Sequence, residues 1–299
     1  MPTPVSPRRR CRSSIIAVLS ALAALSVLAG CSAIKLGYGQ GSAIAFGWFD
    51  NWVDFDDAQS LRVRTGLDDW FTWHRKTQLP DYADLLAGIE ADIVEPTTAE
   101  RTCRLGDEVR RRVDTAVERV LPTVVDVALT LKPKQIVNIE KAYAKRNDDW
   151  RDDFLQPDPV KRRLAAVERD VERAEKLYGP LDESQRQLVA GWVADSPFDA
   201  DVAFAERRRH QQEALDTLRR ISAGGVDQVE AEVQIRAYLQ RRERPPPGPA
   251  RHRAEQLRAY NCRYAAALHN STTAAQRQAA VRTLKGYETD LRALAADAG

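Results

Sequence analysis

The sequence has few sulfur-containing residues, few histidines and almost no net charge. Its 299 residues include four Cys, one Met and four His, and 45 basic residues face 43 acidic ones. Four of the basic residues lie before residue 31, where no acid occurs, so the rest of the chain holds 41 basic and 43 acidic residues. A near-neutral chain lacks the basic field that displaces counterions from phosphates, which argues against nucleic acid as a partner. With 43% hydrophobic and 29% charged residues, the chain is not collagen-like, disordered or multi-spanning.

Motifs that mark common enzyme classes are also missing. The histidines form no i, i+4 pair and no His-Glu-x-x-His motif, and no nucleophile elbow, P-loop or dinucleotide fingerprint occurs. No second Cys or His stands two to four residues from Cys103 or Cys262, which argues against zinc. We therefore expect no metal site, no cofactor and no catalytic residues. A Ser-His-Asp triad assembled by the fold stays open, because its members need not be close in sequence.

The first 30 residues have the composition of a secretion signal. Basic residues at positions 8, 9, 10 and 12 precede an uncharged apolar stretch from Ile15 to Ala29. This stretch has about 15 residues, whereas a helix needs roughly 20 to span a bilayer, so a cleaved signal peptide (1–30) is predicted. Its last residues and the next one, Leu28-Ala29-Gly30-Cys31, resemble the lipobox of bacterial lipoproteins.

The lipobox resemblance implies cleavage between Gly30 and Cys31 and acylation of Cys31. Two or three acyl chains hold a protein on a membrane durably, because each buried CH₂ contributes about 0.8 kcal/mol. Ser32 in place of an aspartate implies, by the sorting rule of Gram-negative lipoproteins, a location on the periplasmic leaflet of the outer membrane. The alternative is an ordinary signal peptide that ends in these residues by chance.

The remaining cysteines predict a disulfide. Cys11 leaves with the signal peptide and Cys31 is acylated, so Cys103 and Cys262 are the two thiols that reach the exported compartment. An even pair in an oxidising periplasm is usually joined. The alternative is two separate buried thiols.

The apolar periodicity predicts an all-α fold, an elongated bundle of about eight to ten helices. Apolar residues recur at three- and four-residue spacing throughout the chain after residue 55, and strand-like alternation is almost absent. Ser196-Pro197 has the pattern of an N-cap followed by a helix-opening proline. We expect a tether and aromatic segment (31–56), a helical bundle (57–244), a proline-rich linker (245–249) and a C-terminal helical hairpin docked on the bundle (250–299).

Three predicted helices begin alike. Each has a candidate N-cap followed three residues later by Gln, whose side chain can reach back to the N–H of the cap. These starts also resemble those of small periplasmic helical chaperones that carry Leu-Thr-x-x-Gln repeats, although the Thr is replaced in two of the three. A purely structural capping role remains the alternative. The residues are Leu131 and Gln135, Leu181 and Gln185, and Thr273 and Gln276.

A further resemblance covers almost the whole chain after the signal. Four segments carry it, and they resemble a family of uncharacterised Gram-negative lipoproteins known only as a domain of unknown function. The resemblance implies lipid attachment and a helical fold, and it implies no activity or site. The segments are residues 31–38, 52–59, 177–181 and 196–199.

Other clusters admit both a functional and a structural interpretation. The stripe of Ile44, Trp48, Trp52 and Phe55 suits either a membrane interface or a packed core. Acids at positions 54, 56 and 57 suit either a catalytic or metal-binding cluster or a turn and helix N-cap. The acids at 148, 149, 152 and 153 have arginine neighbours that can neutralise them, and the basic run 207–210 suits either anionic lipid or acidic partners in the bundle.

These features favour a lipid-anchored, non-catalytic helical scaffold or protein-interaction module of the cell envelope. Its expected partners are the membrane, through the acyl chains on Cys31, and an unidentified envelope protein. One alternative is a periplasmic chaperone-like holdase, which would need an exposed apolar patch. Another is a cell-wall hydrolase working through the paired carboxylates of Asp56 and Asp57.

Overall fold

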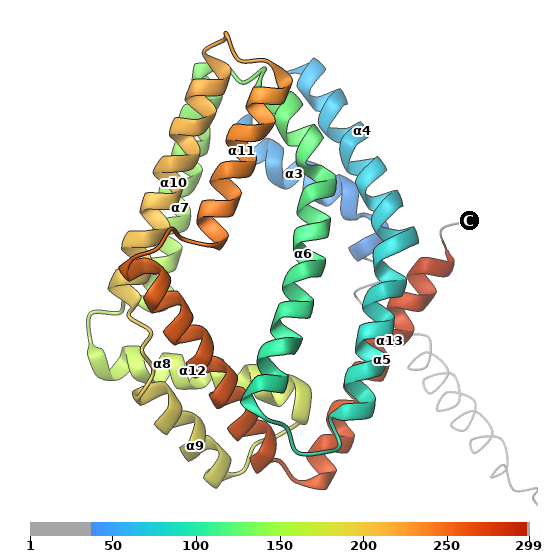
Figure 1. Ribbon diagram of the computed structural model, residues 1–299, viewed down its shortest axis with the longest axis vertical. Coiled ribbons are helices and arrows are strands. Elements are labelled where there is room, and N and C mark those ends of the chain that lie inside the picture. The colour runs from blue at the N-terminus through green and yellow to red at the C-terminus, as the bar shows by residue number, and fades with distance from the viewer. Residues whose placement is uncertain (1–36, 298–299) are drawn as a thin grey trace, which may run out of the picture. The chain divides into compact units, whose positions relative to one another are not determined.

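The computed structural model describes residues 37–297, and within this range the chain folds into eleven α-helices and no strand (Figure 1). The all-α prediction is confirmed, with one helix more than the upper number expected. The helices are α3 (Gly41–Val53), α4 (Asp57–Trp73), α5 (Leu79–Asp92), α6 (Ala99–Ala128), α7 (Pro133–Phe154), α8 (Pro159–Tyr178), α9 (Glu183–Ala194), α10 (Ala200–Ser222), α11 (Gln228–Glu243), α12 (Pro249–Ser271) and α13 (Ala274–Ala296).

A π-helical turn, η1 (His74–Gln78), connects α4 to α5 without a break. Pro80 lies in the first turn of α5 and has no N–H group to donate, so the α-helical ladder cannot pass through the preceding turn unchanged. At the end of α8, Gly179 adopts φ +77°, a conformation that favours glycine, and Pro180 follows it.

One predicted helix start is wrong. The Ser196-Pro197 pair does not open α10, which begins at Ala200. Its N-cap is Asp199, whose carboxylate accepts a hydrogen bond from the N–H of Val202 at 3.0 Å. A carboxylate suits this position because it also interacts with the positive end of the helix dipole.

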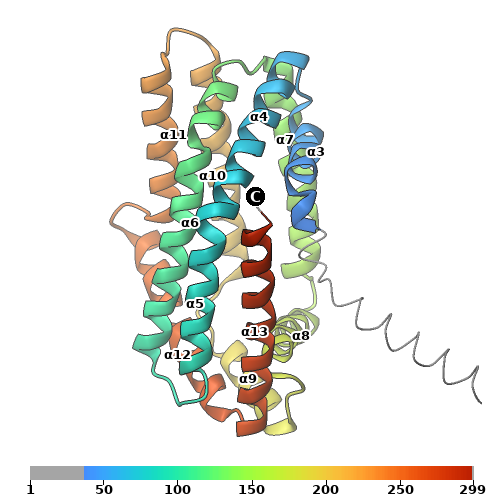
Figure 2. The same cartoon turned by 90° about the vertical axis from the view of Figure 1, so that its right-hand side faces the viewer.

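The helices from Ser42 onward form a single compact unit that includes the proline-rich segment. Helix α6 lies between α4 on one side and α10, α11 and α12 on the other (Figures 1 and 2). Helix α13 packs along α5 and also contacts α8, while α7 pairs with α10 and α9 packs against α8 and α12.

The two C-terminal helices dock on different parts of this unit and do not pair closely with each other. Helix α12 is joined to α6 by a disulfide between Cys103 and Cys262, whose Cα atoms are 5.4 Å apart. Arg258 of α12 also pairs with Asp107 of α6 at 2.6 Å. The predicted joining of these cysteines is therefore present, whereas α13 leaves α12 and runs along α5.

The apolar interior is divided into separate clusters rather than one core. One cluster holds α6 against α10 and α11, a second holds α3, α7 and α10 together, a third lies between α8, α9 and α12, and a fourth lies between α3 and α4. Each fully buried Leu or Val in them contributes about 1.5–3 kcal/mol. The most completely enclosed of the large aliphatic residues in these clusters are Leu121, Val125, Val171, Val189 and Ile221.

Among residues 37–297, no helix is both long enough and apolar enough to cross a membrane. The residues of the proposed signal peptide and lipobox, including Cys31, lie outside the described range.

Candidate functional site

Two pairs of helices are joined at their N-termini by glutamines that face each other. In the first pair, Gln59 of α4 and Gln135 of α7 are both almost completely buried. The Nε2 of each donates to the Oε1 of the other, at 3.2 and 2.6 Å. Gln59 Nε2 also donates to the carbonyl of Thr130 at 2.8 Å, and Gln135 Nε2 to the carbonyl of Asp54 at 2.9 Å.

The second pair repeats this arrangement at the other end of the unit. Gln185 of α9 and Gln276 of α13 exchange two hydrogen bonds of 2.8 Å. Gln185 Nε2 donates to the carbonyl of Ser271 at 3.0 Å, and Gln276 Nε2 donates to that of Pro180 at 2.9 Å. In all four cases the carbonyl belongs to the residue two places before the partner helix's N-cap.

Each glutamine also accepts a hydrogen bond at Oε1 from the N–H of its own N-cap. The N···O distances are 3.1 Å at Asp56, 2.8 Å at Lys132, 3.0 Å at Asp182 and 2.9 Å at Thr273. Each amide therefore makes four hydrogen bonds, two as donor and two as acceptor, which is its full capacity. We call these two pairs of glutamines the glutamine junctions.

The glutamine junctions explain the repeated helix starts and add a fourth member that sequence reasoning missed. Asp56 and Gln59 have the same spacing as the three recognised starts, but Phe55 precedes the N-cap, where two of those starts have a leucine. The signal available in the sequence was the Asp-x-x-Gln spacing itself. The capping pattern thus serves tertiary structure as well as the helix ends.

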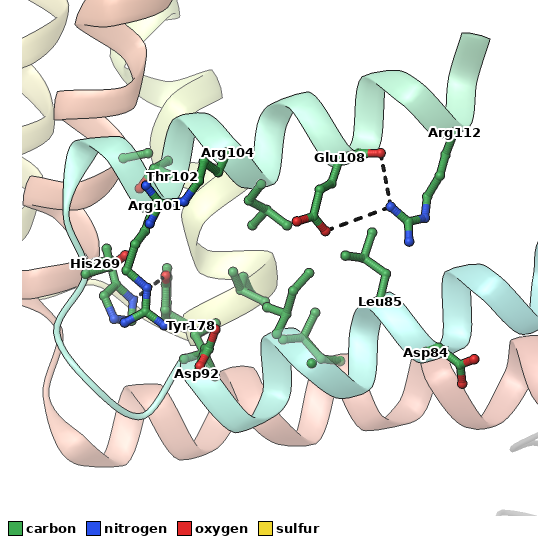
Figure 3. Close-up of a pocket in the computed structure, with 18 residues that line it drawn as sticks. Asp84, Leu85, Asp92, Arg101, Thr102, Arg104, Glu108, Arg112, Tyr178 and His269 are labelled. Carbon is green, nitrogen blue, oxygen red and sulfur yellow. Dashed lines mark hydrogen bonds and ion pairs between the residues drawn. The ribbon is translucent and has the colours of Figure 1, made fainter. Parts of the chain in front are cut away.

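A recess with a mainly apolar lining lies between α5 and α6 and has a volume of about 820 Å³ (Figure 3). Helices α8, α12 and α13 close it. Its middle is apolar, and polar residues gather at its two ends. We call it the α5–α6 groove; the apolar lining residues are Leu85, Ile89, Ile93, Leu105, Leu177, Ala265 and Leu284.

At one end of the α5–α6 groove, a buried histidine fastens the loop between α5 and α6. His269 Nε2 lies 2.8 Å from the carbonyl of Glu95, and its Nδ1 lies 3.0 Å from the hydroxyl of Tyr178. Nε2–H therefore donates to the carbonyl, and Nδ1 accepts from the tyrosine. Burial lowers the pKa of His269 and raises that of Tyr178 to about 12, so both stay neutral at pH 7.

At the other end, charged side chains pair across the groove. Arg112 of α6 contacts the carboxylate of Asp81 of α5 at 2.7 and 3.0 Å, and Glu108 lies one turn before it at 3.9 Å. Near the histidine, Arg101 and Asp92 form an ion pair of 2.9 Å. Figure 3 shows the apolar side chains between these two polar ends.

An exposed valine stripe continues from the groove along α6. Val109 lies one helical turn after Leu105, and Val113 and Val117 follow at four-residue spacing. Val113 is 54% exposed and Val109 is 47% exposed, although the sequence pattern alone suits a buried stripe. The valine stripe (Val109, Val113, Val117) is therefore an apolar surface without a cover from the described residues.

The acids after α3 take part in helix capping and ion pairs. Asp56 accepts a hydrogen bond from the N–H of Gln59 at 2.9 Å and pairs with Lys132 at 2.9 Å. These contacts hold the pKa of Asp56 below its usual value, the bond from Lys132 being the largest cause. Asp54 pairs with Lys134 at 3.0 Å.

The other charged clusters are satisfied by neighbours. Asp148 pairs with Arg151 at 2.5 Å and Asp149 with Arg146 at 3.5 Å. In the basic run, Arg209 pairs with Glu206 at 2.7 Å. No group of three or more potential metal ligands occurs among residues 37–297.

The structure divides the aromatic stripe before α4 between core and surface. Trp52 and Phe55 pack in the cluster between α3, α7 and α10, with Trp52 5.8 Å from the ring of Tyr143. Ile44 and Trp48 remain exposed. Half of the stripe is thus packed in the core, as one of the two interpretations predicts, and the other half is exposed to solvent.

Comparison with known proteins identifies a family. Residues 51–243 match a family of unknown function, DUF6279, and the chain belongs to that family. The matched range contains three of the four junction glutamines and ends before the proline-rich segment. No curated protein and no solved structure matches the chain.

Proposed function

We propose that this protein is a lipid-anchored envelope lipoprotein, held by acyl chains on Cys31 at the periplasmic leaflet of the outer membrane, that acts as a non-catalytic helical protein-interaction module. The lipobox residues and the Ser32 position support the anchor. The disulfide between Cys103 and Cys262 supports an oxidising compartment, because such bonds persist there.

The observation that carries the interaction role is the α5–α6 groove together with the valine stripe beside it. A recess of about 820 Å³ with an apolar middle and charged ends resembles the grooves that receive an amphipathic helix. Exposed apolar surface next to such a groove extends the contact area. The partner chemistry that fits is an amphipathic helix of an envelope protein, with polar or charged groups facing the two ends of the groove.

Site-specific photocrosslinking in intact cells tests this role. A photoreactive amino acid at Val113 is expected to give one discrete adduct, whereas the same residue at Val233, which is 61% exposed on α11, gives none. Leu105→Asp should abolish the Val113 adduct, because it places a charge in the groove wall. An adduct pattern that is identical at both positions, or that survives Leu105→Asp, contradicts the proposal.

The anchor is tested separately by the intact mass of the membrane-extracted protein, with and without reductant. The expected mass lacks residues 1–30 and carries two or three acyl chains on Cys31. An uncleaved or unacylated chain refutes the anchor but does not bear on the proposed role of the α5–α6 groove.

A second candidate, a chaperone-like holdase, is favoured by the valine stripe, since a holdase needs exposed apolar surface for its clients. The unacylated protein should then suppress aggregation of a reduced client such as insulin, and Val113→Asp should remove the effect while Val233→Asp does not. Equal suppression by both variants excludes a role for the stripe. The cell-wall hydrolase draws no support from Asp56, whose carboxylate caps α4 and pairs with Lys132.

A further inference from the structure

Helix α3 presents an apolar, nearly uncharged face to solvent. Its only charged residue is Asp50, whose carboxylate accepts a hydrogen bond from the N–H of Phe55 at 3.0 Å. Ile44 and Trp48 lie four residues apart on the face opposite the buried one, with 60% and 44% of their surfaces exposed. The face therefore carries no charge, and its apolar side chains adjoin the exposed amide of Asn51, one turn after Trp48.

Aromatic rings connect this face to the interior. Trp48 lies 4.5 Å from Trp52, ring centre to ring centre, and Trp52 lies 5.8 Å from Tyr143 of α7. This packing fixes α3 against the unit, so the exposed rings sit on a rigid support.

A basic cavity adjoins the same rings. It has a volume of about 410 Å³ and is lined by Asn51 and Trp52 of α3 and by Asn138, Lys141, Ala142, Lys145 and Arg146 of α7. Figure 2 shows the two helices side by side at one edge of the unit. Arg146 is paired with an acid, Asp149, whereas Lys141 and Lys145 form no ion pair with any residue of the described range. Two positive charges therefore remain uncompensated beside Trp52.

We propose that the outer face of α3 and the basic cavity form a docking surface for an anionic phospholipid bilayer, with a headgroup phosphate at Lys141 and Lys145 and the ring of Trp48 in the interfacial layer. Tryptophan is enriched at this depth because its ring is apolar and its N–H is polar. Juxtamembrane lysines are attracted to anionic headgroups. At 13 residues, α3 is about 20 Å long, too short to span a bilayer but long enough to lie on one.

The position of the predicted anchor agrees with this surface. Cys31 lies ten residues before Gly41, the first residue of α3, and a chain of that length reaches at most about 35 Å. The inference that this surface meets a membrane in the cell rests on the proposed lipid anchor. The expected binding of the unacylated protein to lipid vesicles does not. The surface would give the protein a second membrane contact and hold it in one orientation.

Vesicle sedimentation tests the proposal without acyl chains. The mature chain, residues 31–299 with Cys31→Ser, is mixed with vesicles of phosphatidylglycerol and phosphatidylcholine in equal parts, and with vesicles of phosphatidylcholine alone. It is expected to bind the anionic vesicles more tightly. Lys141→Gln with Lys145→Gln should weaken that binding about 25-fold, at roughly fivefold for each lysine near the surface.

Matched controls separate a specific surface from diffuse charge. Lys76→Gln with Lys161→Gln removes the same charge from exposed positions elsewhere and should leave binding nearly unchanged. Trp48→Ser should weaken binding, whereas Val233→Ser on α11 should not. Thermal unfolding of each variant checks that it is folded.

Several results overturn the proposal: no binding to anionic vesicles, equal binding to neutral ones, or equal losses from the two lysine pairs. If the unacylated chain binds as expected but the native protein carries no acyl chains, the docking surface stands and the anchor falls. If the native protein is acylated but the Cys31→Ser chain does not bind vesicles, the anchor is supported and the docking surface is refuted.

Discussion

Gln185→Glu replaces one side-chain amide of a glutamine junction with a carboxylate of the same shape. In an isolated capping box the two residues are interchangeable, because only the side-chain oxygen accepts from the N-cap. At Gln185 the amide nitrogen also donates to the carbonyl of Ser271 at 3.0 Å and to Oε1 of Gln276 at 2.8 Å. A carboxylate cannot make either bond and would face two oxygens.

The cost follows from these two lost bonds and from burial. Gln185 is about 1% exposed, so water cannot replace the missing donor. An unsatisfied buried acceptor costs about 1–3 kcal/mol, and a buried charge adds to this, so we expect a loss of about 3–5 kcal/mol in the free energy of unfolding. Gln187→Glu is the control, because it makes the same change on the same helix at an exposed position where Gln187 contacts only Glu183.

Urea unfolding followed by circular dichroism at pH 7 measures both variants against the unmodified chain. The Gln187→Glu variant should stay within about 0.5 kcal/mol of the parent. A second reading comes from pH, because protonation of the introduced carboxylate restores one donor and the deficit should shrink as the pH falls. If Gln185→Glu is as stable as Gln187→Glu, or if its deficit does not depend on pH, the account of the glutamine junctions is wrong.

Three further outcomes are expected. Burial lowers the pKa of His74 to about 4, so between pH 6.5 and 4 the unfolded chain binds a proton that the folded chain does not. The free energy of unfolding should therefore fall by about 2 kcal/mol between pH 7 and 5. Urea unfolding at the two pH values should show a smaller difference for His74→Phe. Removing the disulfide with Cys103→Ala and Cys262→Ala should lower stability by up to about 5 kcal/mol, because the bond closes a loop with a sequence separation of 159, and an unchanged urea midpoint would contradict this. Gly66→Ala should destabilise by about 1–3 kcal/mol, since its Cβ would overlap the side chain of Thr123, and Thr123→Ala should restore part of the loss in thermal unfolding.

Most of the helical architecture followed from local signals. The repeated four- and three-residue spacing predicted the helices, and the glycines at 179 and at 224–225 marked two of their ends. The pairing of Cys103 with Cys262 followed from counting the thiols that remain after the predicted signal peptide and the predicted acylated cysteine. The predicted start of α10 is wrong because two good N-cap residues, Ser196 and Asp199, lie three residues apart. The local sequence does not show which of them caps the helix.

The groove and the exposed faces were beyond sequence reasoning. Val109 and Val113 have the periodicity of buried residues, but no neighbouring helix of the described range covers them. His269 has no partner in its own sequence neighbourhood, since it contacts Tyr178 and Glu95, which lie 91 and 174 residues away. The sequence does not show that Lys141 and Lys145 of α7 line a cavity with Trp52 of α3.

The sequence by itself determined the helices, three of the four capping glutamines and the predicted pairing of Cys103 with Cys262, because these depend on local residue patterns or on a count of the remaining thiols. The tertiary structure alone decided that those glutamines must be amides and not acids. Capping needs one acceptor oxygen, which Gln and Glu both supply, whereas meeting a second helix start also needs two donated hydrogen bonds. That requirement arises between segments 76 and 91 residues apart, and no local pattern records it.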